Sequence, residues 1–303
     1  MTLLPGRMWI PSAWLALALA AAVAWALPAD PVEALRRPLP PLARVERAPA
    51  PELGERVERW RMITVAGDTL SALWRAAAPG AGRPWTVVLL GGLVTGERAV
   101  LLVPDAAAHL LAVDWPWREP RRMPWWRVAL RLGAIRRALL RSPAVLALGV
   151  EAAAGAPEVD PARIALVGVS LGVPPAVSAL RLTRRPATLV LLHGAAGLRG
   201  PLRHGLVRQG VPGVVAWPLA ALGARLIHPL EPSLHAAAAG ERPVLIVNAA
   251  DDPLLPAAAV EALHRLFPAA EVRWRAPLHG ASRRSEAIAA ATREVEGWLA
   301  ERR

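Results

Sequence analysis

The sequence contains no cysteine and no tyrosine, and it has a single phenylalanine among 303 residues. Without thiols the chain can form neither structural disulfides nor thiolate metal sites, and a cysteine nucleophile is excluded. The compartment stays open, because a chain that lacks cysteine tolerates either redox state.

Basic residues form no block of five or more, although the formal net charge is +12. A strongly basic surface can attract nucleic acid or anionic lipid. Here the arginines are spread along the whole chain, so we predict no nucleic-acid partner. The sequence also has no His-x-x-x-His pattern and no acidic cluster, so we predict neither a metal nor a cofactor.

Charged residues are absent from residues 8–29, which are rich in Leu and Ala. A run of this length can span a bilayer, and Ala24-Trp25-Ala26 resembles a signal-peptidase site. We therefore expect residues 1–27 to be a signal peptide or a membrane anchor, with membrane association through residues 8–27. The alternative is a buried helix of the domain. We expect the bulk of the chain to be exported, on the periplasmic side, although the arginines after the run weaken a simple orientation rule.

Prolines are concentrated just after this segment, at positions 28, 31, 38, 40, 41, 49 and 51. Proline cannot donate a hydrogen bond to a sheet and disfavours helix in the residue before it. We expect residues 28–55 to form an extended linker.

Strand and helix patterns alternate over residues 56–303. Turn residues separate two strand patterns at 60–65 and 70–75, which predicts an antiparallel hairpin. The apolar run at 85–90 is typical of a strand buried on both faces. Further strands are predicted at 109–113, 164–167, 188–192, 244–247 and 271–275, and helices at 125–141, 171–182, 257–267 and 285–300. This alternation predicts an α/β fold with a mostly parallel central sheet flanked by helices.

Residues 194–240 interrupt the alternation and are too long for a plain loop. A helical pattern lies within them, at 214–227. We expect this segment to be a small helical cap over the site.

The strongest chemical motif is Gly-Val-Ser-Leu-Gly at 168–172, between a predicted strand and a predicted helix. This context is that of a tight strand-to-helix turn that exposes a nucleophilic serine, with glycines where side chains would clash. The motif predicts Ser170 as the nucleophile.

A serine hydroxyl needs a base and an orienting acid to react at neutral pH. Two carboxylates, Asp251 and Asp252, follow the strand at 244–247, and we favour Asp252. The candidate base is His279, on a loop after the last predicted strand. The order serine, acid, histidine is the one expected for this strand-to-helix motif.

A tetrahedral intermediate also needs two N–H donors for its oxyanion. The N–H of Leu171, next to the nucleophile, is one candidate. The glycines Gly91 and Gly92 follow the strand at 85–90 and let the backbone approach the substrate, so we assign the second donor to the N–H of Leu93. His193 ends a predicted strand near the site and is a candidate for lining the substrate pocket.

Together these features resemble the α/β-hydrolase superfamily from about residue 56 to the C-terminus. The resemblance is carried by the Gly91-Gly92 turn, Asp114-Trp115-Pro116, the Ser170 motif, the Asp252 turn and His279. It implies an eight-stranded, mostly parallel sheet with one antiparallel strand near its start. It also implies hydrolysis of an ester, thioester or amide through an acyl-enzyme, and hence a small-molecule acyl substrate.

One position departs from the superfamily pattern, because many members have His-Gly where this chain has Gly91-Gly92. The oxyanion donors are backbone groups, so this change leaves activity possible. Our main prediction is a serine hydrolase of the carboxylesterase kind. The alternatives are a peptidase of the same fold and a non-catalytic, membrane-tethered binding module that kept the fold.

Overall fold

The computed structural model describes residues 30–36, 40–80, 82–92, 95–117, 131–275 and 284–302. The predicted N-terminal apolar segment, residues 1–27, lies outside these ranges. Within them, none of the helices combines the length and the apolar character that a membrane span requires.

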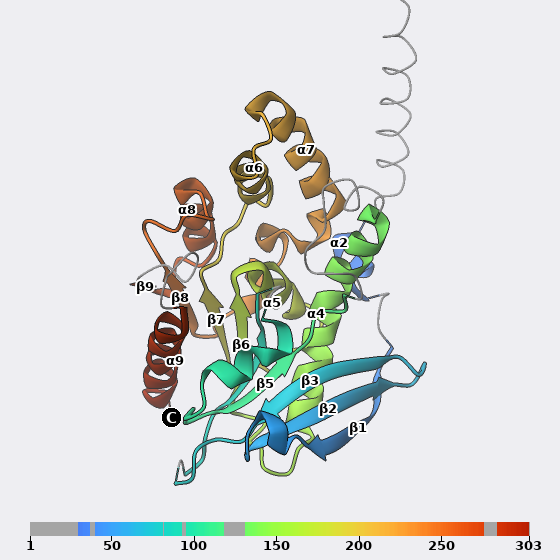
Figure 1. Cartoon of the computed structure of the whole chain (residues 1–303), viewed down its shortest axis with the longest axis vertical. Coiled ribbons are helices and arrows are strands. Elements are labelled where there is room, and N and C mark those ends of the chain that lie inside the picture. Colours follow the sequence, from blue (N-terminus) through green and yellow to red (C-terminus); the bar gives the residue numbers. More distant parts are fainter. Residues whose placement is uncertain are drawn as a thin grey trace, which may run out of the picture.

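A nine-stranded sheet forms the centre of the described chain, in the order β1-β2-β3-β5-β4-β6-β7-β8-β9 (Figure 1). The first three pairings, from β1 to β5, are antiparallel, and all later ones are parallel. This confirms the predicted hairpin and the mostly parallel sheet. The strands are β1 Leu42–Pro49, β2 Val57–Thr64, β3 Thr69–Arg75, β4 Thr86–Leu90, β5 His109–Val113, β6 Ile164–Val169, β7 Thr188–Leu192, β8 Val244–Asn248 and β9 Glu271–Trp274.

Two layers of helices cover the two faces of the sheet. The α-helices α4 (Leu132–Ala154), α5 (Val173–Ala179) and α8 (Ala257–Leu266) pack on one face, and the short 3₁₀ helix η2 (Gly96–Leu102) and α9 (Arg284–Ala300) pack on the other. Successive residues of a strand point to opposite faces. The central strands are therefore almost entirely apolar, and all five residues of β4 are buried.

The prediction that residues 28–55 form an extended linker is corrected by the structure, which has regular elements there. Residues 42–49 form the edge strand β1, and Pro31–Arg36 form the short helix α2, in which Leu35 is fully buried. Proline is tolerated at the end of an edge strand, where it breaks no ladder hydrogen bond. Arg47 fixes β1 to its neighbour by donating to the Glu58 carboxylate at 2.9 Å. The prolines led to the prediction of a linker, but in the structure Pro31 and Pro49 lie at the ends of helix α2 and strand β1.

Two helices lie in the segment predicted to be a cap. They are α6 (Arg199–Arg208), which the sequence pattern did not predict, and α7 (Gly213–Leu226). Figure 1 shows both beyond the carboxyl ends of β6 and β7. Shorter 3₁₀ helices lie at Pro51–Leu53 (η1), Ser170–Gly172 (η3), His228–Leu230 (η4), Pro232–Leu234 (η5) and Ala236–Ala239 (η6).

Helix α4 also differs from its prediction. The helical pattern was placed at 125–141, whereas the described helix continues to Ala154 and contains Pro143. Residues 143–150 within it are all buried and all apolar, and such a segment has no amphipathic period for a sequence pattern to detect.

Helix α9 is attached to the sheet through a buried carboxylate. The Glu294 side chain is 3% exposed and accepts hydrogen bonds from Arg275 Nη2 at 2.7 Å and from Arg273 Nη1 at 3.4 Å. The hydrogen-bonded guanidinium of Arg275 lowers the pKa of Glu294. The charged form of Glu294 therefore stabilises the attachment of α9 to β9.

We expect Glu294→Gln to lower the free energy of unfolding by about 1–2 kcal/mol at neutral pH. A carboxyl whose pKa is lowered in the folded state stabilises the fold at pH values above its unfolded-state pKa of about 4.3. This stabilisation is lost as the pH falls through the folded-state pKa. The free energies of unfolding of wild type and variant, measured by urea unfolding at a series of pH values, should therefore converge in acid. The control is Glu261→Gln, whose exposed partner Arg265 lies at 3.7 Å. A deficit that is independent of pH would contradict this assignment.

Candidate active site

The backbone at Ser170 is strained. Strand β6 ends at Val169, α5 begins at Val173, and Ser170 between them has a φ of 55°. A positive φ is uncommon for a residue with a side chain and costs free energy, so surrounding contacts must hold it in place. This is the geometry that the sequence motif predicts for an exposed nucleophile on a sharp turn.

Two glycines allow the close packing that holds this turn. A Cβ at Gly168 would lie 2.7 Å from the carbonyl oxygen of Gly172 and 2.8 Å from the Cβ of Ala176. A Cβ at Gly172 would lie only 2.3 Å from the carbonyl oxygen of Leu90, at the end of β4. The turn is therefore in backbone contact with the neighbouring strand, and only glycine fits at either position.

The other predicted positions that the structure describes follow neighbouring strands at the same edge of the sheet. Gly91 follows β4, His193 follows β7, and Asp252 lies in the turn after β8. Since parallel strands bring their carboxyl ends together, these positions, far apart in the sequence, lie at the same edge of the sheet as Ser170.

The two candidate acids differ sharply in burial. The Asp252 side chain is 1% exposed and its Oδ1 accepts the Leu254 N–H at 2.9 Å, whereas Asp251 is exposed. An acid that orients an imidazole is held most firmly when it is buried and hydrogen-bonded. This contrast supports the choice of Asp252, which stays a prediction.

His193 has a different position from the one expected for a substrate-binding residue. Its imidazole is 1% exposed, and Nδ1 lies 3.5 Å from Asp252 Oδ2. It is not among the described residues that line the cavity at Ser170. Its backbone N–H donates to Val247 at 2.7 Å, and its φ is 50°. His193 is therefore a contact of the candidate acid in the turn after β8.

The predicted base, His279, and the predicted second oxyanion donor, Leu93, lie outside the described residues. Their roles stay predictions.

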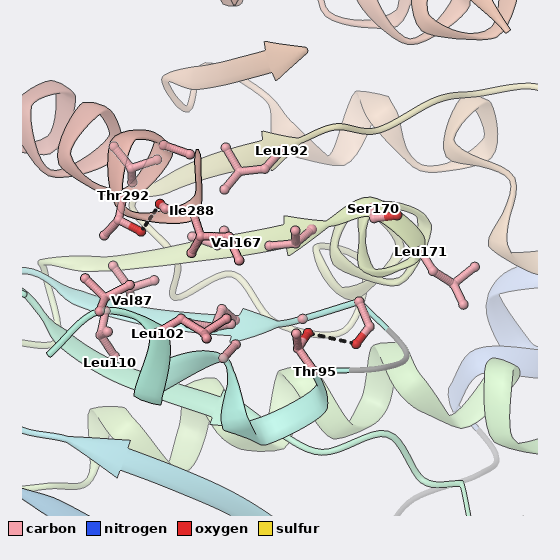
Figure 2. Close-up of a pocket in the computed structure, with 18 of the residues that line it drawn as sticks. Val87, Thr95, Leu102, Leu110, Val167, Ser170, Leu171, Leu192, Ile288 and Thr292 are labelled. Carbon is pink, nitrogen blue, oxygen red and sulfur yellow. Dashed lines mark hydrogen bonds between the residues drawn. The ribbon is translucent and has the colours of Figure 1, made fainter. Parts of the chain in front are cut away.

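A cavity of about 350 Å³ begins at Ser170. Gly91, Gly92 and Leu171, three of the residues predicted to surround the substrate, line it together with Ser170. Leu254, whose N–H is bonded to Asp252, lines it as well. The close-up in Figure 2 shows Ser170 and Leu171 at one end of the lining. The structure thus brings Ser170 and the glycine turn after β4 to a single cavity.

Three contacts that support the candidate site were not predicted. The buried indole of Trp115 donates to the Gly91 carbonyl at 2.9 Å and so fixes the turn after β4. The only sign of this Trp115 contact in the sequence was the Asp-Trp-Pro motif after β5.

Arg208 of α6 donates to the Pro253 carbonyl at 2.7 Å, and the ring of His204 lies 3.0 Å from the same oxygen. These bonds attach the cap segment to the turn that carries Asp252.

Titratable groups near the carboxyl edge have shifted pKa values. Burial raises the pKa of Glu97, which lies in the first turn of η2 and accepts a hydrogen bond from Ser71 at 2.6 Å. Burial lowers the pKa of His264, whose Nε2 lies 3.1 Å from Asn248 Nδ2. Both shifts favour the neutral forms. In the part of the chain that the structure describes, no group of three His, Asp or Glu residues could hold a metal ion.

Comparison with protein families gives one match. The family model Abhydrolase_4, described as TAP-like protein, matches residues 225–301, a segment that contains the Asp252 turn. Among curated proteins, none matches the sequence significantly.

Solved structures with a similar fold include esterases and a peptidase. An esterase from Pyrococcus furiosus has 18% identity and a TM-score of 0.52, over 87% of this chain and 95% of its own. Acetyl xylan esterase 1 from Thermoanaerobacterium has 15% identity and a TM-score of 0.55, over 88% and 94%. A puromycin-hydrolyzing peptidase from Mycobacterium tuberculosis has 17% identity and a TM-score of 0.57, over 86% of this chain but 41% of its own.

The sheet order and these structures show the α/β-hydrolase fold that the sequence predicts, and the family model matches residues 225–301 within it. Eight of the strands, β2 to β9, correspond to the eight-stranded sheet that the resemblance implied, and β1 adds a further edge strand. At 15–18% identity, these solved structures show a shared fold.

The steric role of Gly172 can be tested with a pair of matched substitutions. We expect Gly172→Ala to lower the free energy of unfolding by about 2 kcal/mol or more, because the new Cβ meets the Leu90 carbonyl. Gly297→Ala, in open space on α9, should instead stabilise by about 0.5–1 kcal/mol. Urea unfolding measures both. Equal effects of the two substitutions would show that the close contact at Gly172 is unimportant.

Proposed function

We propose that this protein is a serine hydrolase that cleaves a carboxylic ester through an acyl-enzyme. One observation carries the proposal: Ser170 is held with a positive φ on a tight turn and opens onto an apolar cavity. Holding a serine in this conformation costs free energy, and strain of this kind clusters at functional sites.

In the proposed mechanism Ser170 Oγ attacks the ester carbonyl carbon while its proton passes to the His279 imidazole. The oxyanion accepts hydrogen bonds from the N–H groups of Leu171 and Leu93. The C–O bond then breaks, and the alcohol leaves with the proton from His279. A water molecule repeats the sequence on the acyl-enzyme, which releases the carboxylic acid and regenerates Ser170.

Asp252 is proposed to orient His279 and to stabilise its protonated form. Burial of the carboxylate and the bond from the Leu254 N–H support this role, because both fix its position. His193, at 3.5 Å, would limit the movement of the same carboxylate from the β7 side.

An amide substrate is the second candidate, because one similar structure is a puromycin-hydrolyzing peptidase. This chain spans 41% of that protein's length, so the similarity concerns the shared fold. Hydrolysis of p-nitroanilides faster than of the corresponding p-nitrophenyl esters would favour the amide.

A fluorophosphonate probe tests the nucleophile. We expect the wild type to be labelled in a one-to-one ratio and Ser170→Ala to remain unlabelled, with kcat for p-nitrophenyl butyrate lowered by about 10³-fold or more. Intact-protein mass spectrometry measures the labelling. A wild type that is not labelled would favour the non-catalytic binding module.

The base is tested in the same assay by comparing two histidines. His279→Ala should abolish turnover of p-nitrophenyl butyrate, whereas His193→Gln should retain most of it. The reverse result would assign the base to His193 and overturn the role proposed for His279.

The two neighbouring carboxylates provide a matched test of the acid. Asp252→Asn should lower kcat by about 10³–10⁴-fold, since the amide no longer stabilises the charged imidazole. Asp251→Asn, in the same turn but exposed, should stay within about twofold of the wild type. Similar losses for both variants, or a larger loss for Asp251→Asn, would contradict the assignment.

A further inference from the structure

The cavity that begins at Ser170 is long and follows the strands. It extends along β4 from Gly91 back to Val87, a distance of about 13 Å at ~3.3 Å per residue. In Figure 2, Ser170 and Leu171 lie at one end, while Val87, Leu110 and Thr292 lie at the other. The cavity therefore leads from the nucleophile into the interior, towards the amino ends of the strands.

Its walls are the sheet on one side and the layer of η2 and α9 on the other. Helix α9 contributes a single face, because its lining residues follow the helical spacing i, i+3, i+4, i+7 and i+8: Ile288, Ala291, Thr292, Val295 and Glu296. The short 3₁₀ helix η2 covers only part of the sheet face beside α9. Protein interiors rarely contain voids larger than a water molecule. A cavity of 350 Å³ at this position is within the size range of ligand sites.

The polar groups of the wall are already hydrogen-bonded within the protein. The Thr95 hydroxyl donates to the Gly92 carbonyl, and the Thr292 hydroxyl to the Ile288 carbonyl, both at 3.0 Å. The Glu296 carboxylate accepts the backbone N–H groups of residues 107 and 108 at 2.6 and 3.2 Å.

The remaining described lining residues are aliphatic or glycine, apart from Ser170 itself, and none is aromatic. A polar ligand would leave its own groups unsatisfied in this cavity, and the wall offers no ring on which a sugar or an aromatic group could stack.

Exposure shows which end is open. Leu171 and Leu254, beside Ser170, are 39% and 41% exposed, whereas Val87 and Leu110 are 5% and 4% exposed. The cavity is therefore open at the nucleophile and closed at the far end. During ester hydrolysis the alcohol must leave and water must enter, while the acyl group stays bonded to Ser170. A closed end suits the group that stays.

We propose that this cavity binds the aliphatic acyl chain of the substrate, so that the enzyme prefers esters of unbranched medium-chain acids. The proposal rests on the proposed function of Ser170. It places the determinant of chain length on α9 and η2, rather than on the cap segment that contains α6 and α7.

A series of p-nitrophenyl esters from acetate to dodecanoate tests the preference. We expect kcat/KM to rise about fourfold for each added methylene while the chain fills the cavity, and then to level off when it reaches the closed end. A flat series, or one that falls from acetate onwards, would overturn the proposal.

A matched pair of substitutions on α9 tests the location. Ala291 lines the cavity and is 4% exposed, whereas Ala290 is exposed on the same helix. Ala291→Phe should remove the rise for longer chains, so that kcat/KM for the octanoate ester falls at least tenfold more than kcat/KM for the acetate ester. Ala290→Phe should keep the full rise. If the rise survives in Ala291→Phe, the acyl chain binds elsewhere.

A binding measurement separates this proposal from the catalytic one. Isothermal titration of the Ser170→Ala variant with sodium octanoate should show binding, and the double variant with Ala291→Phe should show at least tenfold weaker binding. Octanoate binding in a protein that hydrolyses no ester would overturn the proposed function and support the cavity. Ester hydrolysis without octanoate binding, and with no dependence on chain length, would overturn the cavity and support the function.

Discussion

Backbone contact between β4 and the turn after β6 is the constraint on which the site depends. The Leu90 carbonyl lies so close to Gly172 that no side chain fits there, and Gly168 faces the same crowding from the first turn of α5. This packing presses the turn against the sheet and holds Ser170 at a positive φ. The same contact brings the Gly91 turn beside the serine. The positions of the proposed nucleophile and of the proposed oxyanion turn therefore both depend on this contact between Gly172 and Leu90.

The two faces of the sheet are covered in different ways, and this difference shapes the site. On one face α4 and α5 pack closely, and their buried side chains form a continuous core with β4 and β6. On the other face a short 3₁₀ helix and α9 leave a cavity beside the sheet. Helix α9 is held over this cavity by Glu294, which binds Arg273 and Arg275, and by the fully buried Trp298. Stability and the shape of the proposed acyl site therefore depend on the same helix.

Much of the fold was predictable because its signals are local. The eight strand predictions coincide with β2 to β9 within a few residues, and the central strands give the clearest signal because a strand buried on both faces is almost entirely apolar. The errors also have physical causes. The edge strand β1 has no such run, because it is exposed and stabilised by ion pairs such as that of Arg47 with Glu58. Residues 143–150 of α4 are all buried and apolar, so this part of the helix has no amphipathic period.

The sequence by itself determined the positions of the strands, the serine between two glycines and the order of the candidate residues, because these depend on residue type and spacing. Only the tertiary structure decided that Asp252 is buried while Asp251 is exposed, and that His193 lies against Asp252 rather than in the cavity. It also decided that the cavity follows β4 beneath α9. Burial and voids arise from how distant segments pack against one another, and no local pattern of residues encodes that packing.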